Sequence, residues 1–138
     1  MWRLTGVSVM KGFFVIDSGD TAWMLISTGL VLFMTPGLAF FYGGMVRAKN
    51  MLGMLMQNFF AMGLMAILWV TIAFSLAFGN FGDGGFIGNL DFAWMRNINA
   101  TTGSEAFALT IPFVLFCAYQ MTFAVITPAL ITGATADR

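Results

Sequence analysis

The chain has 138 residues, a formal net charge of +0 and no histidine, with 59% hydrophobic and 9% charged residues. Soluble domains average about 45–50% apolar and about 25% charged residues, so this chain, with a mean hydropathy of +0.88, has too little charge for a water-facing surface and is predicted to be a membrane protein. The lack of histidine excludes histidine-based catalysis, and the single cysteine, Cys117, excludes intrachain disulfides and cysteine-rich metal sites. The zero net charge gives no sign of the basic surface that binds nucleic acid. We therefore expect no enzyme, no catalytic residue, no metal, no cofactor and no nucleic-acid partner.

Residues 1–20 precede the first long apolar run and are expected to form an extracytoplasmic N-terminal leader. Arg3 followed by apolar residues hints at a signal peptide, which stays the alternative. Against it, Lys11 interrupts the apolar run and no clear small-residue cleavage site follows. The stretch from Asp17 to Thr21 is rich in residues that cap helix N-termini, just ahead of the first predicted helix.

Three long runs without charged residues predict an all-α integral membrane protein with three transmembrane helices. The spans are expected over about residues 21–46, 51–78 and 107–136, with Pro112 near the start of the third and an outer link over 79–105. Each run exceeds the roughly 20 apolar residues that a spanning helix needs. The alternative, buried core helices of a large soluble protein, would need covering segments that this sequence does not contain.

The positions of Lys and Arg predict the orientation of these helices in the membrane. The short link between the first two spans contains Arg47 and Lys49 and no acidic residue, whereas the outer link holds Asp83, Asp91 and Glu105 against a single basic residue, Arg96. Positive charge favours the cytoplasmic side. We therefore expect the N-terminus and the outer link outside, and the C-terminus in the cytoplasm.

Proline and polar residues inside the spans predict local features of the helices. Pro36 and Pro128 are expected to kink the first and third helices, either for packing or as a pore-facing break, and Thr35 offers a hydroxyl beside the first kink. The amides of Gln57 and Asn58 must find hydrogen bonds within the hydrocarbon, through helix packing or in a cavity. No span carries an ionisable residue, which argues against a proton relay built from these three helices.

The third span has a periodic face that combines aromatic and polar side chains. Its members recur at spacings of three and four residues and therefore share one side of a helix; they are Phe113, Phe116, Gln120, Phe123 and Thr127. Such a face suits a narrow lumen that aromatic rings occlude, and each ring attracts a cation by about 0.5–2 kcal/mol. Ordinary helix packing is the alternative that periodicity alone leaves open.

Several stretches resemble the ammonium transporter (Amt/Mep/Rh) family. They lie at residues 20–25, 34–47, 68–79, 86–90 and 119–134, including MTPGLAFFYGGMVR in the first span and YQMTFAVITPALITGA in the third. The resemblance covers about residues 17–138. It implies a multi-pass protein of the plasma membrane, a bacterial inner membrane for a bacterial source, that forms a homotrimer in membrane lipid. Each protomer would enclose its own pore within about eleven spanning helices, recruit ammonium at the outer mouth and pass ammonia through an apolar lumen.

The resemblance also implies roles for three residues of the third span. Phe123 corresponds to the outer of two stacked phenylalanines that gate the pore, and Gln120 to a pore-side position near the outer vestibule. Tyr119 stands where many members have phenylalanine. The family's paired lumen histidines and second gating phenylalanine belong to later helices, so we expect this chain to be an N-terminal fragment, a partial transporter domain over 21–138.

Two further functions stay open at this stage. The same membrane module could belong to an ammonium-sensing signalling protein, in which a signalling domain follows the last helix. A non-transporting three-helix membrane protein is the third hypothesis. Against it, Gln57, Asn58, Gln120 and the two proline breaks need polar partners that three helices supply poorly.

Overall fold

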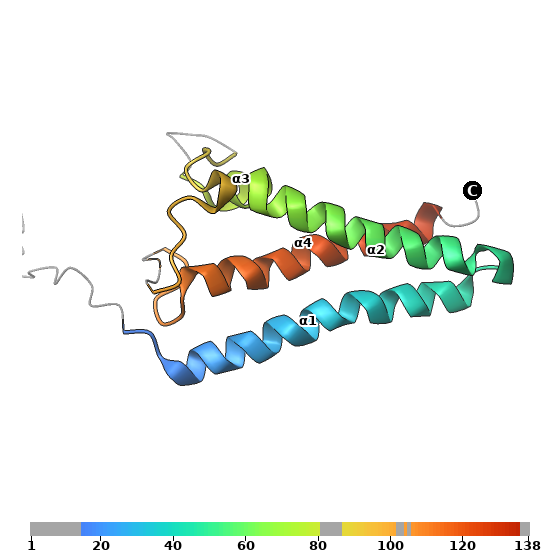
Figure 1. Ribbon diagram of the computed structural model, residues 1–138, viewed down its shortest axis with the longest axis horizontal. Coiled ribbons are helices and arrows are strands. Elements are labelled where there is room, and N and C mark those ends of the chain that lie inside the picture. The colour runs from blue at the N-terminus through green and yellow to red at the C-terminus, as the bar shows by residue number, and fades with distance from the viewer. Residues whose placement is uncertain (1–14, 81–86, 102–103, 105, 136–138) are drawn as a thin grey trace, which may run out of the picture.

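The computed structural model describes residues 15–80, 87–101, 104 and 106–135, and this part of the chain is helical without a strand. Three long helices run side by side (Figure 1), and each is long and apolar enough to cross a membrane. This confirms the predicted class of an all-α protein with three transmembrane helices. Most of the expected leader, residues 1–14, and the end of the third expected span, 136, lie outside the described residues.

Helix α1 (Ser18–Met45) begins at the predicted cap. Asp17 is the N-cap residue, and its carboxylate accepts a hydrogen bond from the backbone N–H of Asp20 at 2.8 Å, which satisfies one of the free donors at the helix start. The 28 residues of α1 correspond to about 42 Å, so the helix can cross a hydrocarbon core of about 30 Å with tilt. A tight link containing the short helix η1 (Ala48–Asn50) then reverses the chain.

The second span is one continuous helical path with an irregular turn inside it. Helix α2 (Met51–Leu68) passes into a π-helical turn, η2 (Trp69–Ala73), and then into α3 (Phe74–Phe78). The backbone N–H of Phe74 bonds the carbonyl of Trp69, five residues earlier, so this turn holds one residue more than an α-helical turn. The sequence predicted the span over 51–78 but not this turn.

The third long helix, α4 (Phe113–Thr135), begins later than the expected position of about 107. The preceding residues are irregular: Ser104 and Ala108 exchange backbone hydrogen bonds of 2.8 and 2.9 Å, and the carbonyl of Thr110 accepts from Asp17 N–H at 2.9 Å. Pro112 explains the late start, because proline disfavours helical backbone in the residue before it and suits the first turn of a helix.

The outer link crosses the end of the second span at very close range. The Ser75 hydroxyl donates to the carbonyl of Asn89 at 2.7 Å and accepts from Phe92 N–H at 3.0 Å. A Cβ atom on Gly79 or Gly88 would lie 2.4 or 2.6 Å from the carbonyl oxygen of Ser75. Only glycine therefore allows the two backbone segments to approach this closely. Beyond the crossing, the link forms the short helix η3 (Ala93–Met95).

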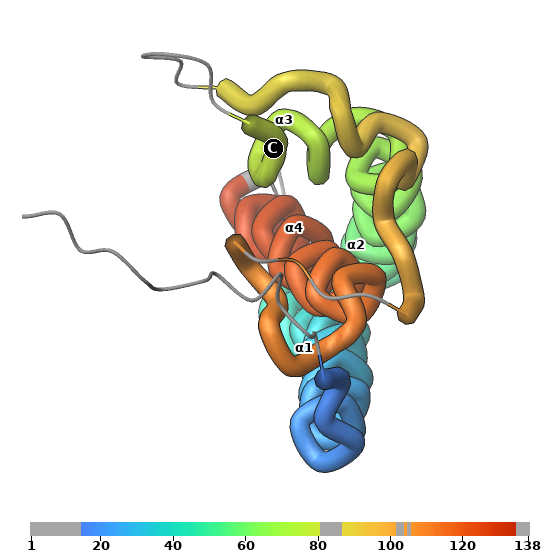
Figure 2. The backbone as a smooth tube through the Cα atoms, turned by 90° about the vertical axis from the view of Figure 1, so that its left-hand side faces the viewer, coloured from blue at the N-terminus to red at the C-terminus, as the bar shows by residue number. Residues whose placement is uncertain are grey.

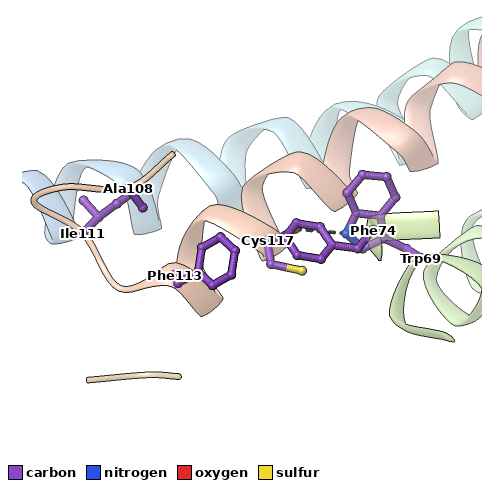
Figure 3. Packing of buried hydrophobic residues seen from close by; sticks show 6 residues of the cluster. All are labelled: Trp69, Phe74, Ala108, Ile111, Phe113 and Cys117. Atoms are coloured by element: carbon purple, nitrogen blue, oxygen red, sulfur yellow. Dashed lines mark hydrogen bonds between the residues drawn. The ribbon is translucent and has the colours of Figure 1, made fainter. Parts of the chain in front are cut away.

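The interior differs between the two ends of the bundle. The end that carries the outer link has an aromatic-rich cluster of Trp69, Phe74, Ala108, Ile111, Phe113 and Cys117 (Figure 3). At the other end the helices meet through small residues, with Ala39 1% and Ala129 0% exposed. Small side chains let membrane helices approach closely. Figure 2, which looks toward the end with the outer link, shows α4 beside both α1 and α2.

Candidate functional site

The three residues expected to gate or line a pore lie together in the middle of α4. Tyr119 and Gln120 are half-buried and Phe123 is 42% exposed. The rings of Tyr119 and Phe123 stand 5.1 Å apart, centroid to centroid, at an interplanar angle of 79°, which is the edge-to-face geometry that aromatic pairs favour. The structure therefore places an aromatic pair beside a polar amide on a stretch of α4 that these three helices cover only in part.

The N-terminal part of the periodic α4 face packs against the end of the second span. Phe113 is 4% exposed, and its ring lies 5.7 Å from that of Phe74 and 5.4 Å from that of Phe92. The Phe116 ring stands edge-on to Phe78 at 5.2 Å. These side chains join α4 to the end of the second span, so the packing interpretation holds for this part of the face.

The C-terminal part of the same face is exposed. Phe123 and Thr127 are exposed, and the Thr127 hydroxyl donates back to the carbonyl of Phe123 at 2.8 Å. The predicted face is thus divided at about Gln120. The residues before Gln120 pack in the core, and the residues after it form an exposed surface with an aromatic ring and a hydroxyl.

The two predicted kink prolines lie inside continuous helices, Pro36 in α1 and Pro128 in α4. Pro128 has no N–H, so the carbonyl of Ala124, four residues earlier, lacks its usual helical donor. Thr35, expected to help at the first break, does not supply a hydrogen bond there. Its Oγ1 is buried, without any hydrogen-bond partner.

Two polar contacts join the helices in the half of the bundle away from the outer link. The buried Asn58 amide donates to the carbonyl of Met54 at 2.8 Å and accepts from the Thr132 hydroxyl at 3.2 Å. The Tyr42 hydroxyl donates to the carbonyl of Leu130 at 3.2 Å. For Asn58, which is 1% exposed, the structure supports the packing role rather than the cavity-lining one.

Sequence reasoning missed a third tie, at the other half of α4. The indole Nε1 of Trp69 donates to the backbone carbonyl of Cys117 at 3.2 Å, and Trp69 is 8% exposed. A signal was present in the sequence, because Trp69 lies well inside its span, whereas membrane tryptophans usually lie at span ends. A buried indole N–H needs an acceptor, and in hydrocarbon a carbonyl of a neighbouring helix can provide it.

Comparison with known proteins identifies the family. Residues 22–138 match the model of the Ammonium Transporter Family. The chain belongs to this family. Its packed α1–α2–α4 unit therefore corresponds to part of a multi-pass plasma-membrane protein, and the resemblance seen in the sequence is confirmed.

Individual members of the Ammonium Transporter Family share both sequence and fold with the chain. An ammonium transporter of Mycobacterium tuberculosis is 47% identical over 137 residues, covering 90% of this chain and 28% of the relative. One of Bacillus subtilis is 44% identical over 125 residues, covering 89% and 30%. The crystal structure of Saccharomyces cerevisiae Mep2 matches with a TM-score of 0.72 at 28% identity, over 95% of this chain and 29% of that one. The chain thus spans less than a third of the length of these relatives.

Proposed function

We propose that this chain forms the outer-gate part of an ammonium transporter, and that the complete protein moves ammonium or ammonia across the plasma membrane. The match over residues 22–138 to the family carries this proposal. The placement of Phe123, Tyr119 and Gln120 on one partly open stretch of α4 supports it. The same support favours a transporter over an enzyme.

In this proposal each of the three residues has a separate task. The Phe123 ring closes the path and, with its negative π face, attracts the cation by about 0.5–2 kcal/mol. Tyr119 packs edge-on to that ring at 5.1 Å and holds its orientation. The Gln120 side-chain carbonyl accepts a hydrogen bond from the N–H groups of the ion, which partly replaces the water that the ion loses.

The partners follow from the same family assignment. We infer a homotrimer embedded in membrane lipid, with ammonium or ammonia as substrate and no role for nucleic acid. The exposed apolar side chains along the helices, such as Phe33 (75%) and Phe40 (62%), support lipid or further helices as their surroundings. We also propose that the N-terminus and the outer link lie outside; the charges of the two links support this orientation.

Uptake of methylammonium by cells that lack their own ammonium transporters tests this function. The full-length reading frame should restore uptake, and Phe123→Ala should change it because the ring that closes the path is lost. Phe33→Ala, which removes an equally large ring from the exposed face of α1, is the matched control and should leave uptake unchanged.

The outcome separates this proposal from the other hypotheses. Absence of uptake, with the full-length protein present in the membrane, would show that the protein is not a transporter and would favour the sensing module. Uptake that is equally affected by Phe123→Ala and Phe33→Ala would retain the transport function but remove Phe123 from the gate.

A further inference from the structure

The π-helical turn of the second span turns the indole of Trp69 toward α4. The extra residue in η2 changes the direction of the side chains in this turn, and Trp69 lies 8% exposed with its Nε1 3.2 Å from the carbonyl oxygen of Cys117 (Figure 3). Because the acceptor is a backbone atom, this hydrogen bond holds the α4 helix itself and not a mobile side chain. The Met95 thioether contacts the same residue, with 3.6 Å between the two sulfur atoms.

The gate residues of α4 lie between Cys117, which accepts the Trp69 hydrogen bond, and Pro128. On the inner side, Leu130 and Thr132 are tied to Tyr42 and Asn58. Pro128 lies between the inner and outer ties and interrupts the backbone hydrogen bonds of the helix. The segment from 118 to 127 packs against the neighbouring helices through the buried side chains of Thr122, Val125 and Ile126. The Trp69 bond to Cys117 fixes this segment at its N-terminal side.

We propose that Trp69 is a positioning residue for the outer gate. Its indole N–H, acting through the Cys117 carbonyl, adds to the packing of α4 a hydrogen bond that adjusts the rotation of this helix and thereby the direction in which Gln120 and Phe123 point. This role rests on the proposed transport function, because it presumes that the open stretch of α4 faces the path of the substrate.

Trp69→Phe isolates the contribution of the N–H group. The phenyl ring can keep the edge contacts that Trp69 makes with Phe74 (5.7 Å) and Phe78 (6.3 Å). The Cys117 carbonyl keeps its helical donor four residues later, so no buried polar group is left without a partner. The variant is therefore expected to fold. If it does not accumulate, the benzothienyl analogue of tryptophan, which has the same shape with sulfur in place of N–H, replaces it with the same expected outcomes.

The first measurement compares the uptake of methylammonium with that of ammonium by the full-length transporter, normalised to the amount in the membrane. Trp69→Phe should change this ratio and the apparent KM by about threefold to a hundredfold, since small misplacements of binding groups have effects of this size. Trp23→Phe is the matched control because the Trp23 side chain is 72% exposed on α1, and it should change neither. A loss of abundance with an unchanged ratio would reduce Trp69 to a structural residue and overturn the proposal.

The second measurement does not depend on transport. In a full-length background with Cys117→Ala and any other cysteines removed, Gln120→Cys and Ala118→Cys report two sides of α4, about 200° apart. Adding Trp69→Phe should change the ratio of their labelling rates with a membrane-impermeant thiol reagent, whereas adding Trp23→Phe should not. An unchanged ratio would overturn the proposal whatever the uptake shows. A changed ratio of labelling rates in a protein without uptake would support the effect of Trp69 on the rotation of α4. It would refute only the transport function.

Discussion

At the scale of single residues, Thr35 is notable because its polar hydroxyl group lies in an apolar environment. Its hydroxyl is buried between the helices, 1% exposed, and has no hydrogen-bond partner. Thr28, which lies earlier in the same helix, shows the usual arrangement for a hydroxyl group in a helix. Its hydroxyl donates a hydrogen bond to the carbonyl of Met24 at 2.7 Å. A buried hydroxyl without a partner costs roughly 1–3 kcal/mol, so Thr35 destabilises the packed state.

Thr35→Val should therefore stabilise the protein by about 1–3 kcal/mol, because valine has the same shape and lacks the unpaired hydroxyl. The measurement is the thermal stability of the detergent-solubilised full-length protein. Thr28→Val is the control, and we expect it to be neutral or slightly destabilising. Equal destabilisation by both substitutions would mean that the Thr35 hydroxyl has a partner in the complete protein.

At the scale of elements, the contact of α2 with α4 includes a buried polar pair, Asn58 and Thr132. The Thr132 hydroxyl is shared between Asn58 Oδ1 at 3.2 Å and the carbonyl of Ala129 at 2.7 Å. Hydrogen bonds between membrane helices are worth about 0.6 kcal/mol on average and at most about 1.7 kcal/mol. The pair therefore specifies how the helices align more than it stabilises them.

A double-mutant cycle of Asn58→Leu and Thr132→Val should give a coupling energy within this range, close to about 0.6 kcal/mol. The same cycle with Thr127→Val in place of Thr132→Val should give no coupling, because the Thr127 hydroxyl bonds the carbonyl of Phe123 within its own helix. The measurement is the free energy of unfolding in detergent for each variant. Equal coupling in both cycles would contradict the contact.

The junction of the outer link with the second span is the second feature at this scale. Gly88→Ala should lower the amount of folded protein strongly, since its Cβ would lie 2.6 Å from the carbonyl oxygen of Ser75 and 2.9 Å from that of Leu76, and backbone atoms cannot move away as a flexible side chain does. Gly63→Ala in α2, where the new methyl group meets no atom within 4 Å beyond the neighbouring residues and backbone of its own helix, should be tolerated. Folded protein is quantified by size-exclusion chromatography of solubilised membranes, and normal levels of the Gly88→Ala protein would contradict the close crossing.

At the scale of the whole molecule, the three helices form a unit with a packed interior and exposed apolar side chains on each long helix. The aromatic cluster and the outer link close one end, whereas Phe123, Phe33 and Phe40 remain exposed. Further helices or lipid must cover such surfaces in a membrane protein.

The proposed orientation is testable on the intact protein. Asn99→Cys in the outer link should react with a membrane-impermeant thiol reagent added to whole cells, because we place this link outside. Lys49→Cys in the link between α1 and α2 should react only after the membrane is opened, because the positive charges of this link favour the cytoplasm. Reaction of Lys49→Cys in intact cells would reverse the assignment.

The three spans could be predicted from the sequence because a charged residue is costly in hydrocarbon, so the gaps between charges mark the helices. The start of α1 was equally predictable, since Asp17 caps the helix by a local hydrogen bond. The residues of the candidate site came from the family resemblance, and Tyr119, Gln120 and Phe123 stay proposals that the transport experiments must test.

Only the tertiary structure decided the features that depend on contacts between distant segments. These are the π-helical turn at Trp69, the unpaired hydroxyl of Thr35 and the division of the α4 face at Gln120. The physical reason is the same in each case: helical periodicity states which side chains share a face, but whether that face is buried or open depends on which neighbouring helix packs against it. The sequence alone indicated that the chain has three membrane-spanning helices, and the packing determined which of its polar and aromatic groups remain available for function.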